Sequence, residues 1–290
     1  MIFGLHRQQV IANIKRNIAK KQFNAKAELH DPVLSKKQTK ELVNKYWNYA
    51  STTSYRIINP VIRSVFALAS VLLTKRCKIE GLENLPNTST AFITGNHYNQ
   101  FDVLLMKRLA MKKHQRLFVV VEASNLAMPY LIGWAVRNFD SLPIDNNFHY
   151  LSRIFPKKLS QTLTKPCWIL IYPEQELWFN YSKPRPLKKG AYYYAAKLNQ
   201  PIISTFTEIR ATAKRELFHR DFYKTQKILH ILPTIYPDSN LKLAENMTRM
   251  WQKDYKQKKA AYENYYNQKL SSDFSYKDIA GFAPKKNKII

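Results

Sequence analysis

Short apolar runs recur through the middle of the chain, and segments with helical patterning separate them. The clearest runs are 91–94, 117–122, 168–172 and 201–206, with a weaker one at 230–232. Runs this short suit buried strands, whereas the segments between them are long enough for helices. Strands that alternate with helices predict an α/β fold with a mostly parallel central sheet flanked by helices.

The segments between the runs predict the connecting elements. Helices are expected at 100–113, 128–136, 149–164 and 190–198, a short strand and turn at 78–86, and an edge strand with Pro143 at 140–145. We treat residues 57–240 as one catalytic-type domain flanked by helical ends. Residues 1–56 form a basic helical N-terminal arm and 241–290 a basic helical C-terminal extension, which is a loosely held tail from Ser271 onward.

The N-terminal arm predicts two helices. Apolar residues spaced by three and four positions predict an amphipathic basic helix within 1–30, and Ser35 is a candidate N-cap for the next helix. Two interpretations stand for this arm. It packs on the main domain, or it lies on a membrane, where basic residues beside Ile, Phe and Trp suit an anionic interface.

The most apolar window of the chain follows the arm. Asn59-Pro60 is expected to start a helix, and residues 61–73 are nearly all apolar, with Arg63 as the one charged residue. This run is short of the ~20 residues that a spanning helix needs, so no membrane span is expected. Two alternatives remain for residues 57–76: a helix buried in the fold, or a membrane-surface helix whose following cations meet lipid phosphates.

The charge restricts the partners. Lys and Arg number 47 against 20 Asp and Glu, a net charge of +27, and residues 1–56, 57–210 and 211–290 each carry part of the excess. A basic excess spread over a whole fold suits a polyanion, which is either nucleic acid or an anionic membrane face.

The cysteines and the N-terminus bear on location. Cys77 and Cys167 form no disulfide framework and no metal-binding spacing, which suggests a reducing cytosolic setting. The first residues carry no signal-peptide pattern. The expected location is the cytoplasmic face of a membrane, peripheral or monotopic.

The most informative stretch follows the strand at 91–94. Asn99 is a candidate N-cap for the next helix, which places Asp102 at the third helical position, where a carboxylate reaches back toward the cap. It could then orient His97 as a general base for a hydroxyl, at the strand end where α/β sheets bind ligands. For an isolated pair with this spacing, the simpler interpretation is a helix cap beside a structural histidine.

Five short sequence segments, one of which contains His97 and Asp102, follow one another along the chain. They are Ile-Glu-Gly-Leu-Glu-Asn-Leu-Pro at 79–86, Asn96-His97 followed by Asp102, Tyr-Pro-Glu at 172–174, Pro-Leu-Lys-Lys-Gly-Ala at 186–191 and Pro-Ile-Ile at 201–203. Together they resemble the lysophosphatidate acyltransferase family of glycerolipid acyltransferases, over roughly residues 78–205.

The resemblance implies transfer of a fatty acyl group from acyl-CoA or acyl-carrier protein to a hydroxyl of a lysophospholipid, such as 1-acylglycerol-3-phosphate. It implies His97 as general base, Asp102 as its orienting partner, basic groups that hold the acceptor phosphate, and neither metal nor cofactor. The expected partners are an anionic membrane surface, the lysophospholipid and the acyl donor, with no nucleic acid. The chemistry agrees, because a thioester needs only a base, an oriented hydroxyl and donors for the oxyanion.

Two motifs depart from the family pattern. Gln175-Glu176-Leu177 stands where the family has Gly-Thr-Arg, so the phosphate-binding arginine is missing. Basic residues just downstream are candidate substitutes, or else belong to a solvated loop; the candidate phosphate-binding set is Lys183, Arg185, Lys188, Lys189 and Gly190. Arg137 is a candidate surrogate for a second missing arginine, whose place Asn146 takes.

Glu174 cannot bind a phosphate directly, although it belongs to the same substrate-binding region. We expect it to pair with a basic residue or to accept backbone N–H groups that fix the loop. The simpler interpretation is a surface turn residue.

Two other functions remain open from sequence alone. One is a basic nucleic-acid-binding protein, which explains the charge and the 13% aromatic content but not the ordered segments. The other is a family member that has lost catalysis and only binds lipid, for which the altered third motif is the argument.

Overall fold

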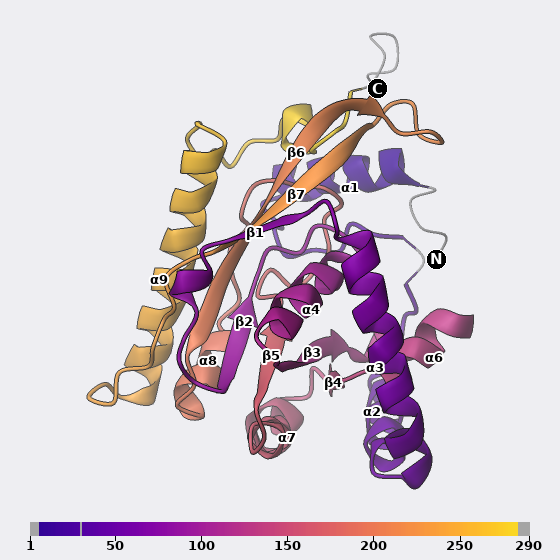
Figure 1. Ribbon diagram of the computed structural model, residues 1–290, viewed down its shortest axis with the longest axis vertical. Coiled ribbons are helices and arrows are strands. Elements are labelled where there is room, and N and C mark those ends of the chain that lie inside the picture. The colour runs from indigo at the N-terminus through magenta and orange to yellow at the C-terminus, as the bar shows by residue number, and fades with distance from the viewer. Residues whose placement is uncertain (1–5, 30, 284–290) are drawn as a thin grey trace.

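The computed structural model describes residues 6–29 and 31–283, and a seven-stranded sheet forms its centre (Figure 1). The strands are β1 (Lys78–Glu80), β2 (Thr90–Thr94), β3 (Arg116–Glu122), β4 (Ser141–Ile144), β5 (Cys167–Ile171), β6 (Ile202–Arg215) and β7 (Tyr223–Ile231). They lie in the order β1-β7-β6-β2-β5-β3-β4, and every neighbouring pair is parallel except β6 and β7. The predicted α/β class with a mostly parallel sheet is confirmed.

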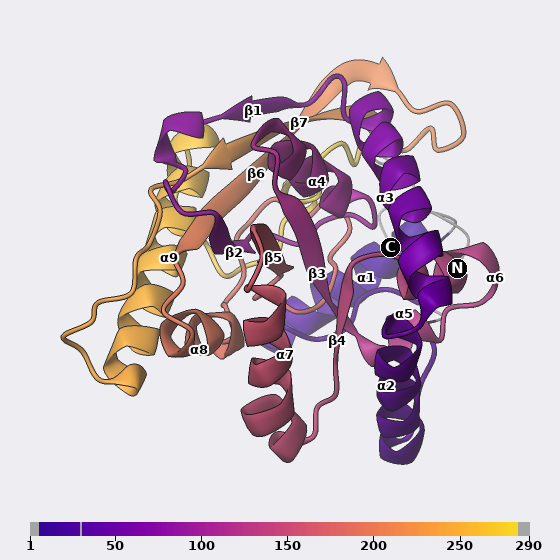
Figure 2. The same cartoon turned by 60° about the horizontal axis from the view of Figure 1, so that its bottom comes forward.

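Helices cover both faces of this sheet (Figure 2). They are α1 (Arg7–Ala19), α2 (Lys36–Ala50), α3 (Thr53–Leu73), α4 (Asp102–Lys112), α5 (Ala123–Leu126), α6 (Tyr130–Asn138), α7 (Phe155–Thr162), α8 (Gly190–Lys197) and α9 (Leu243–Tyr265). Successive strand side chains point to opposite faces. On β2, Phe92 therefore joins a core with α7, α8 and α9, whereas Ala91 and Ile93 join a core with α3 and α4. Two covered faces explain why the strand runs are apolar throughout.

The first amphipathic helix packs on the protein. Val10, Ile11, Ile14 and Ile18 of α1 are buried in a cluster with Trp178 and other residues of the later chain. Of the two interpretations of the N-terminal arm, packing on the main domain is correct for α1. The second helix begins as predicted, because the Ser35 side chain accepts from the backbone N–H of Gln38 in a capping box.

The start predicted for the next helix is wrong. α3 begins at Thr53, where the side chain of Thr52 accepts from the backbone N–H of Tyr55 (3.3 Å), and Pro60 lies inside the helix. A proline removes one backbone hydrogen bond from a helix, but here it does not interrupt the helix. The longer helix changes the membrane argument as well. α3 has 21 residues, and among the described helices it alone has the length and hydropathy of a membrane span.

The C-terminal end is held more tightly than the sequence suggests. Ser275 caps a short turn at Tyr276–Asp278, and Ile279 is 1% exposed against the cluster that contains α1. The prediction of a loose tail is therefore wrong for residues 271–283, and residues 284–290 lie outside the described part. Nothing tests the domain boundaries, which stay predictions.

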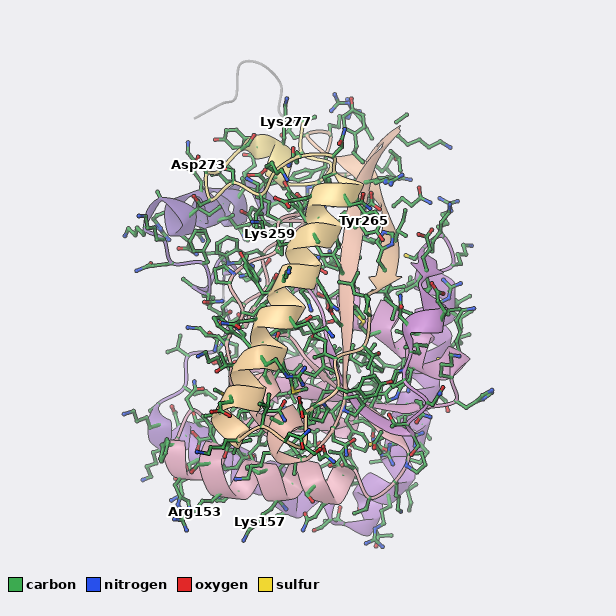
Figure 3. The ribbon with its side chains drawn as sticks, turned by 90° about the vertical axis from the view of Figure 1, so that its left-hand side faces the viewer. Arg153, Lys157, Lys259, Tyr265, Asp273 and Lys277 are labelled. Carbon is green, nitrogen blue, oxygen red and sulfur yellow. The ribbon has the colours of Figure 1, made fainter. Side chains whose placement is uncertain are left out.

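Exposed cations lie far apart on the side of the molecule that carries α9. In Figure 3, Lys259 and Lys277 lie toward one end, and Arg153 and Lys157 near α7 lie at the other. This arrangement agrees with the even spread of charge along the chain.

Candidate active site

Two neighbouring strands bring the site residues to one edge of the sheet. β2 and β5 pair in parallel with Thr94 opposite Ile171, so the segments that follow them leave the sheet side by side. His97 follows the first strand, and Tyr172 and Glu174 follow the second. The carboxyl edge of a parallel sheet is where such folds bind ligands.

The predicted contact between the histidine and the aspartate is present. Nδ1 of His97 lies 2.7 Å from Oδ2 of Asp102, which also accepts from the backbone N–H groups of Tyr98 (3.1 Å) and Asn99 (3.4 Å). Asp102 is buried, whereas the His97 side chain is 22% exposed. With Nδ1 bound to the carboxylate, Nε2 is the ring nitrogen left to meet a substrate.

The predicted helix cap is wrong in detail. α4 starts at Asp102 with Phe101 in the N-cap position, and Asn99 instead closes the preceding turn. Its side-chain oxygen accepts from the backbone N–H of Phe101 (3.0 Å), and its carbonyl accepts from that of Asp102 (3.1 Å). Asp102 still reaches back to the backbone before the helix, because the turn brings residues 98 and 99 to its carboxylate.

Tyr172 is a third residue that contacts both His97 and Asp102, and the sequence analysis did not single it out. Its hydroxyl donates to Oδ1 of Asp102 (2.6 Å), and its ring stacks on that of His97 with centroids 4.1 Å apart and planes 8° apart. Burial, followed by the negative charge of Asp102, raises the pKa of Tyr172 well above its ordinary value, so the hydroxyl stays a donor. The sequence signal that could have identified Tyr172 is its position directly after a buried strand.

Tyr172→Phe should lower kcat about tenfold, because a hydrogen bond to a charged group contributes roughly 1.5–3 kcal/mol. A carboxylate with one donor fewer stabilises the protonated imidazole more strongly, so the acid limb of the kcat/KM pH profile should move to higher pH. The control is Tyr236→Phe, a half-exposed tyrosine elsewhere. A rate loss with an unmoved profile would mean that the hydroxyl only supports packing.

Glu174 fixes the backbone of the histidine. Its carboxylate accepts from the backbone N–H groups of His97 (3.2 Å) and Arg185 (3.0 Å), and from Nε of the Arg185 guanidinium (3.1 Å). Glu174 and Arg185 are 2% and 1% exposed. Burial lowers the pKa of Arg185, and the charge of Glu174 acts against that shift. The expected supporting role, with a basic partner and backbone donors, matches these contacts.

Two of the predicted phosphate contacts face the protein interior. Nζ of Lys183 bonds to the Asp278 carboxylate (2.9 Å) and to the carbonyl of Asp273 (2.8 Å). Arg185 is engaged by Glu174 and by the carbonyl of Phe23 (3.0 Å), and its guanidinium lies 4.5 Å from the Trp178 ring centroid. As placed, Lys183 and Arg185 hold the loop together and offer no surface to a substrate phosphate.

The other predicted contacts are more accessible. Lys188, Lys189 and Gly190 are exposed at the start of α8, and the backbone N–H of Lys188 bonds to the carbonyl of Pro173 (2.8 Å). This hydrogen bond holds the loop against the end of β5. Arg137 is half-buried and donates to the carbonyl of Leu126 (2.5 Å).

Gln175 accounts for one departure from the family pattern. Its φ is +68°, in the left-handed region that favours glycine, and it occupies the position where the family has Gly. The loop thus keeps a glycine-like backbone with a side chain present.

Residues 23–27 cross over this loop, and the sequence analysis missed them. The Asn24 side-chain amide donates to the carbonyls of Glu174 (3.1 Å) and Pro186 (2.8 Å), and the Trp178 indole donates to the carbonyl of Ala25 (2.8 Å). We call residues 23–27 the N-terminal strap. These contacts span about half the chain, and a local sequence pattern cannot indicate them.

The strap also brings acidic groups near His97. Burial and then the charge of Asp31 raise the pKa of Glu28 to about 7, and the charge of His97 acts in the opposite direction. Burial likewise raises the pKa of Glu176, which stands in the altered motif. Within residues 6–29 and 31–283, no cluster of His, Cys, Asp or Glu could hold a metal ion.

Known acyltransferases resemble this chain in sequence and in fold. Residues 76–207 match the family model described as Acyltransferase. An uncharacterized acyltransferase of Schizosaccharomyces pombe is 26% identical over 179 residues, which is 60% of this chain and 61% of that relative. The crystal structure of the 1-acyl-sn-glycerophosphate acyltransferase PlsC from Thermotoga maritima shares the fold, with a TM-score of 0.50 and 14% identity over 82% of this chain and 100% of that one. Residues 76–207, somewhat less than half of the chain, thus resemble an acyltransferase domain, which agrees with the ordered motifs around His97.

Proposed function

We propose that the chain transfers a fatty acyl group from an acyl-CoA or acyl-carrier-protein thioester to the hydroxyl of a lysophospholipid such as 1-acylglycerol-3-phosphate. The observation that carries this proposal is the 2.7 Å contact between His97 and Asp102 at the end of β2, inside the matched acyltransferase region. The proposal needs no metal and no cofactor beyond the acyl-donor co-substrate.

The reaction follows from the orientation of the imidazole. Nε2 of His97 takes the proton of the acceptor hydroxyl while the hydroxyl oxygen forms a bond to the thioester carbonyl carbon. The C–S bond then breaks, and the imidazolium returns the proton to the departing thiolate. Asp102 holds the tautomer and stabilises the imidazolium, as a buried carboxylate does in a catalytic triad.

For the acceptor phosphate we retain Lys188 and Lys189, the exposed cations of the predicted set. Lys189 lies over the Trp251 ring with Nζ 4.8 Å from its centroid, which leaves the side chain at the surface. In the family, an arginine at the position of Leu177 binds the acceptor phosphate. Here Glu28 and Glu176 lie near His97 instead, and their carboxylates would repel a phosphate at that place. The acceptor phosphate would therefore approach from the side of α8.

The exposed face of α3 supports a place on a membrane surface. Val61, Val65 and Leu68 are each more than half exposed, and α6 beside it exposes Tyr130 and Leu131. Figures 1 and 2 both place α3 and α6 on the same side of the molecule. Apolar side chains flanked by cations fit the interface of an anionic bilayer on its cytoplasmic face.

A panel of lysophospholipid acceptors with labelled acyl-CoA and acyl-carrier protein, offered in anionic vesicles, tests the proposal. We expect a diacyl product from at least one pair, and co-sedimentation with the vesicles that weakens as salt screens the charges. No product from any pair would reject the acyltransferase activity. Sedimentation with duplex DNA or RNA in place of vesicles would favour a nucleic-acid-binding function.

A further inference from the structure

A hollow lies between α3 and α4, away from the contacts of His97. Its lining residues are Pro60, Arg63, Ser64 and Ala67 of α3 and Lys107 and Met111 of α4. Lys107 is five residues beyond Asp102, which corresponds to ~7.5 Å along the helix axis. The proposed acyl transfer does not use this hollow.

Lys107 is buried without a polar partner. It is 4% exposed, and no described residue makes a hydrogen bond or an ion pair with its ammonium group. Its contact is with the ring of Phe139, 5.9 Å from Nζ to the centroid. Burial lowers its pKa, Asp140 acts against the shift, and the charges of Arg63 and Arg116 add to it. A largely buried cation that no protein group pairs with is costly unless an anion or water meets it.

The nearby carboxylate is already occupied. Arg116 engages both oxygens of Asp140, at 2.9 and 2.6 Å, and the Asn59 amide adds a third donor at 3.0 Å. Arg63 lies 3.3 Å from the same carboxylate, yet its buried Nε has no hydrogen-bond acceptor among the described residues. Two arginines thus contact one carboxylate and Lys107 lies near them, so positive charge exceeds negative charge beside the hollow that Arg63 and Lys107 line.

We infer that this hollow is an anion site that takes a phosphate group between Lys107 and Arg63. A phosphate would supply the negative charge that the cluster lacks, and it would accept from the Lys107 ammonium group and the terminal guanidinium nitrogens of Arg63. The neighbouring apolar residues Val61, Val65 and Leu68 on the outer face of α3 favour a membrane phospholipid as its source, since acyl chains could lie against them. Free phosphate has the same binding chemistry.

The test compares Lys107→Met with Lys112→Met, which makes the same charge change at an exposed position of the same helix. Unfolding midpoints are measured in sodium phosphate against sodium chloride at equal ionic strength, and binding is measured with phosphatidylglycerol vesicles. For wild type and Lys112→Met, we expect a higher unfolding midpoint in phosphate, binding to the vesicles, or both. Lys107→Met should bind the phosphate or the vesicles at least about tenfold more weakly than wild type, since a charge-assisted hydrogen bond is worth roughly 1.5–3 kcal/mol.

Each arm has a decisive result. A loss confined to the vesicle arm supports the site with phospholipid as its ligand, and a loss with inorganic phosphate supports it with phosphate itself. Equal responses of the two variants in both arms would overturn the inference, as would a wild type that responds in neither. If Lys107→Met does not fold, Lys107→Gln takes its place. Because neither arm measures acyl transfer, failure of the proposed enzyme activity would not affect the outcome.

Discussion

His97→Ala should lower kcat for acyl transfer by about 10²–10⁴-fold, the range that a positioned general base contributes. The loss should be this large because the acceptor hydroxyl is not ionised at neutral pH, and no other histidine contacts Asp102 in the described residues. The histidine side chain is partly exposed and supports no core cluster, so the unfolding midpoint and vesicle binding should stay close to those of wild type. The measurement is single-turnover transfer with the best donor and acceptor of the panel.

The control for this experiment is His149→Ala, which removes an exposed imidazole from the helical segment that leads into α7. It should keep wild-type activity. If His97→Ala retained activity within a few-fold of wild type while folding normally, the assignment of the base would fail. The chain would then be better described as a lipid-binding relative of the acyltransferases.

Glu174→Ala should lower the free energy of unfolding by about 3–5 kcal/mol, because it leaves the buried Arg185 guanidinium without a counter-charge. The same change removes the acceptor for the backbone N–H of His97. Urea unfolding followed by circular dichroism measures the effect. Adding Arg185→Met to this variant should recover part of the loss, because the uncompensated charge of the guanidinium is then removed from this site.

Glu41→Ala is the matched control, since Glu41 is an exposed carboxylate on α2. Its effect should fall within about 0.5 kcal/mol of zero, as for most surface substitutions. A loss below about 1 kcal/mol for Glu174→Ala would show that water or another group compensates Arg185. The ion pair would then not be what holds the loop.

The sheet could be predicted from the sequence because its strands are buried on both faces and read as apolar runs. The pairing of His97 with Asp102 could also be predicted, since it depends on residues five positions apart around one turn. The start of α3 was missed because Pro60 is a strong local signal, although the cap at Thr52 outweighs it. Local patterns were sufficient where the interaction itself is local.

The rest of the site depends on contacts between distant segments. The sequence shows Arg185 as one of several cations in a basic loop, and only the fold reveals that it is fully buried against Glu174. Lys183 is similarly directed inward by Asp278, which lies 95 residues later. Charge patterns cannot separate a phosphate ligand from an internal ion pair, because both require the same residue types.

The loop that carries Glu174 is enclosed by the two ends of the chain. The N-terminal strap bonds to it through Asn24, and Asp278 and Ile279 bond to it from the other end of the sequence. Closing such long-range contacts costs chain entropy and comes late in folding. The loop around Glu174 should therefore be enclosed only after both the N-terminal strap and residues 278–279 have docked, so a chain clipped before Asp278 would keep the contact between His97 and Asp102 without this enclosure.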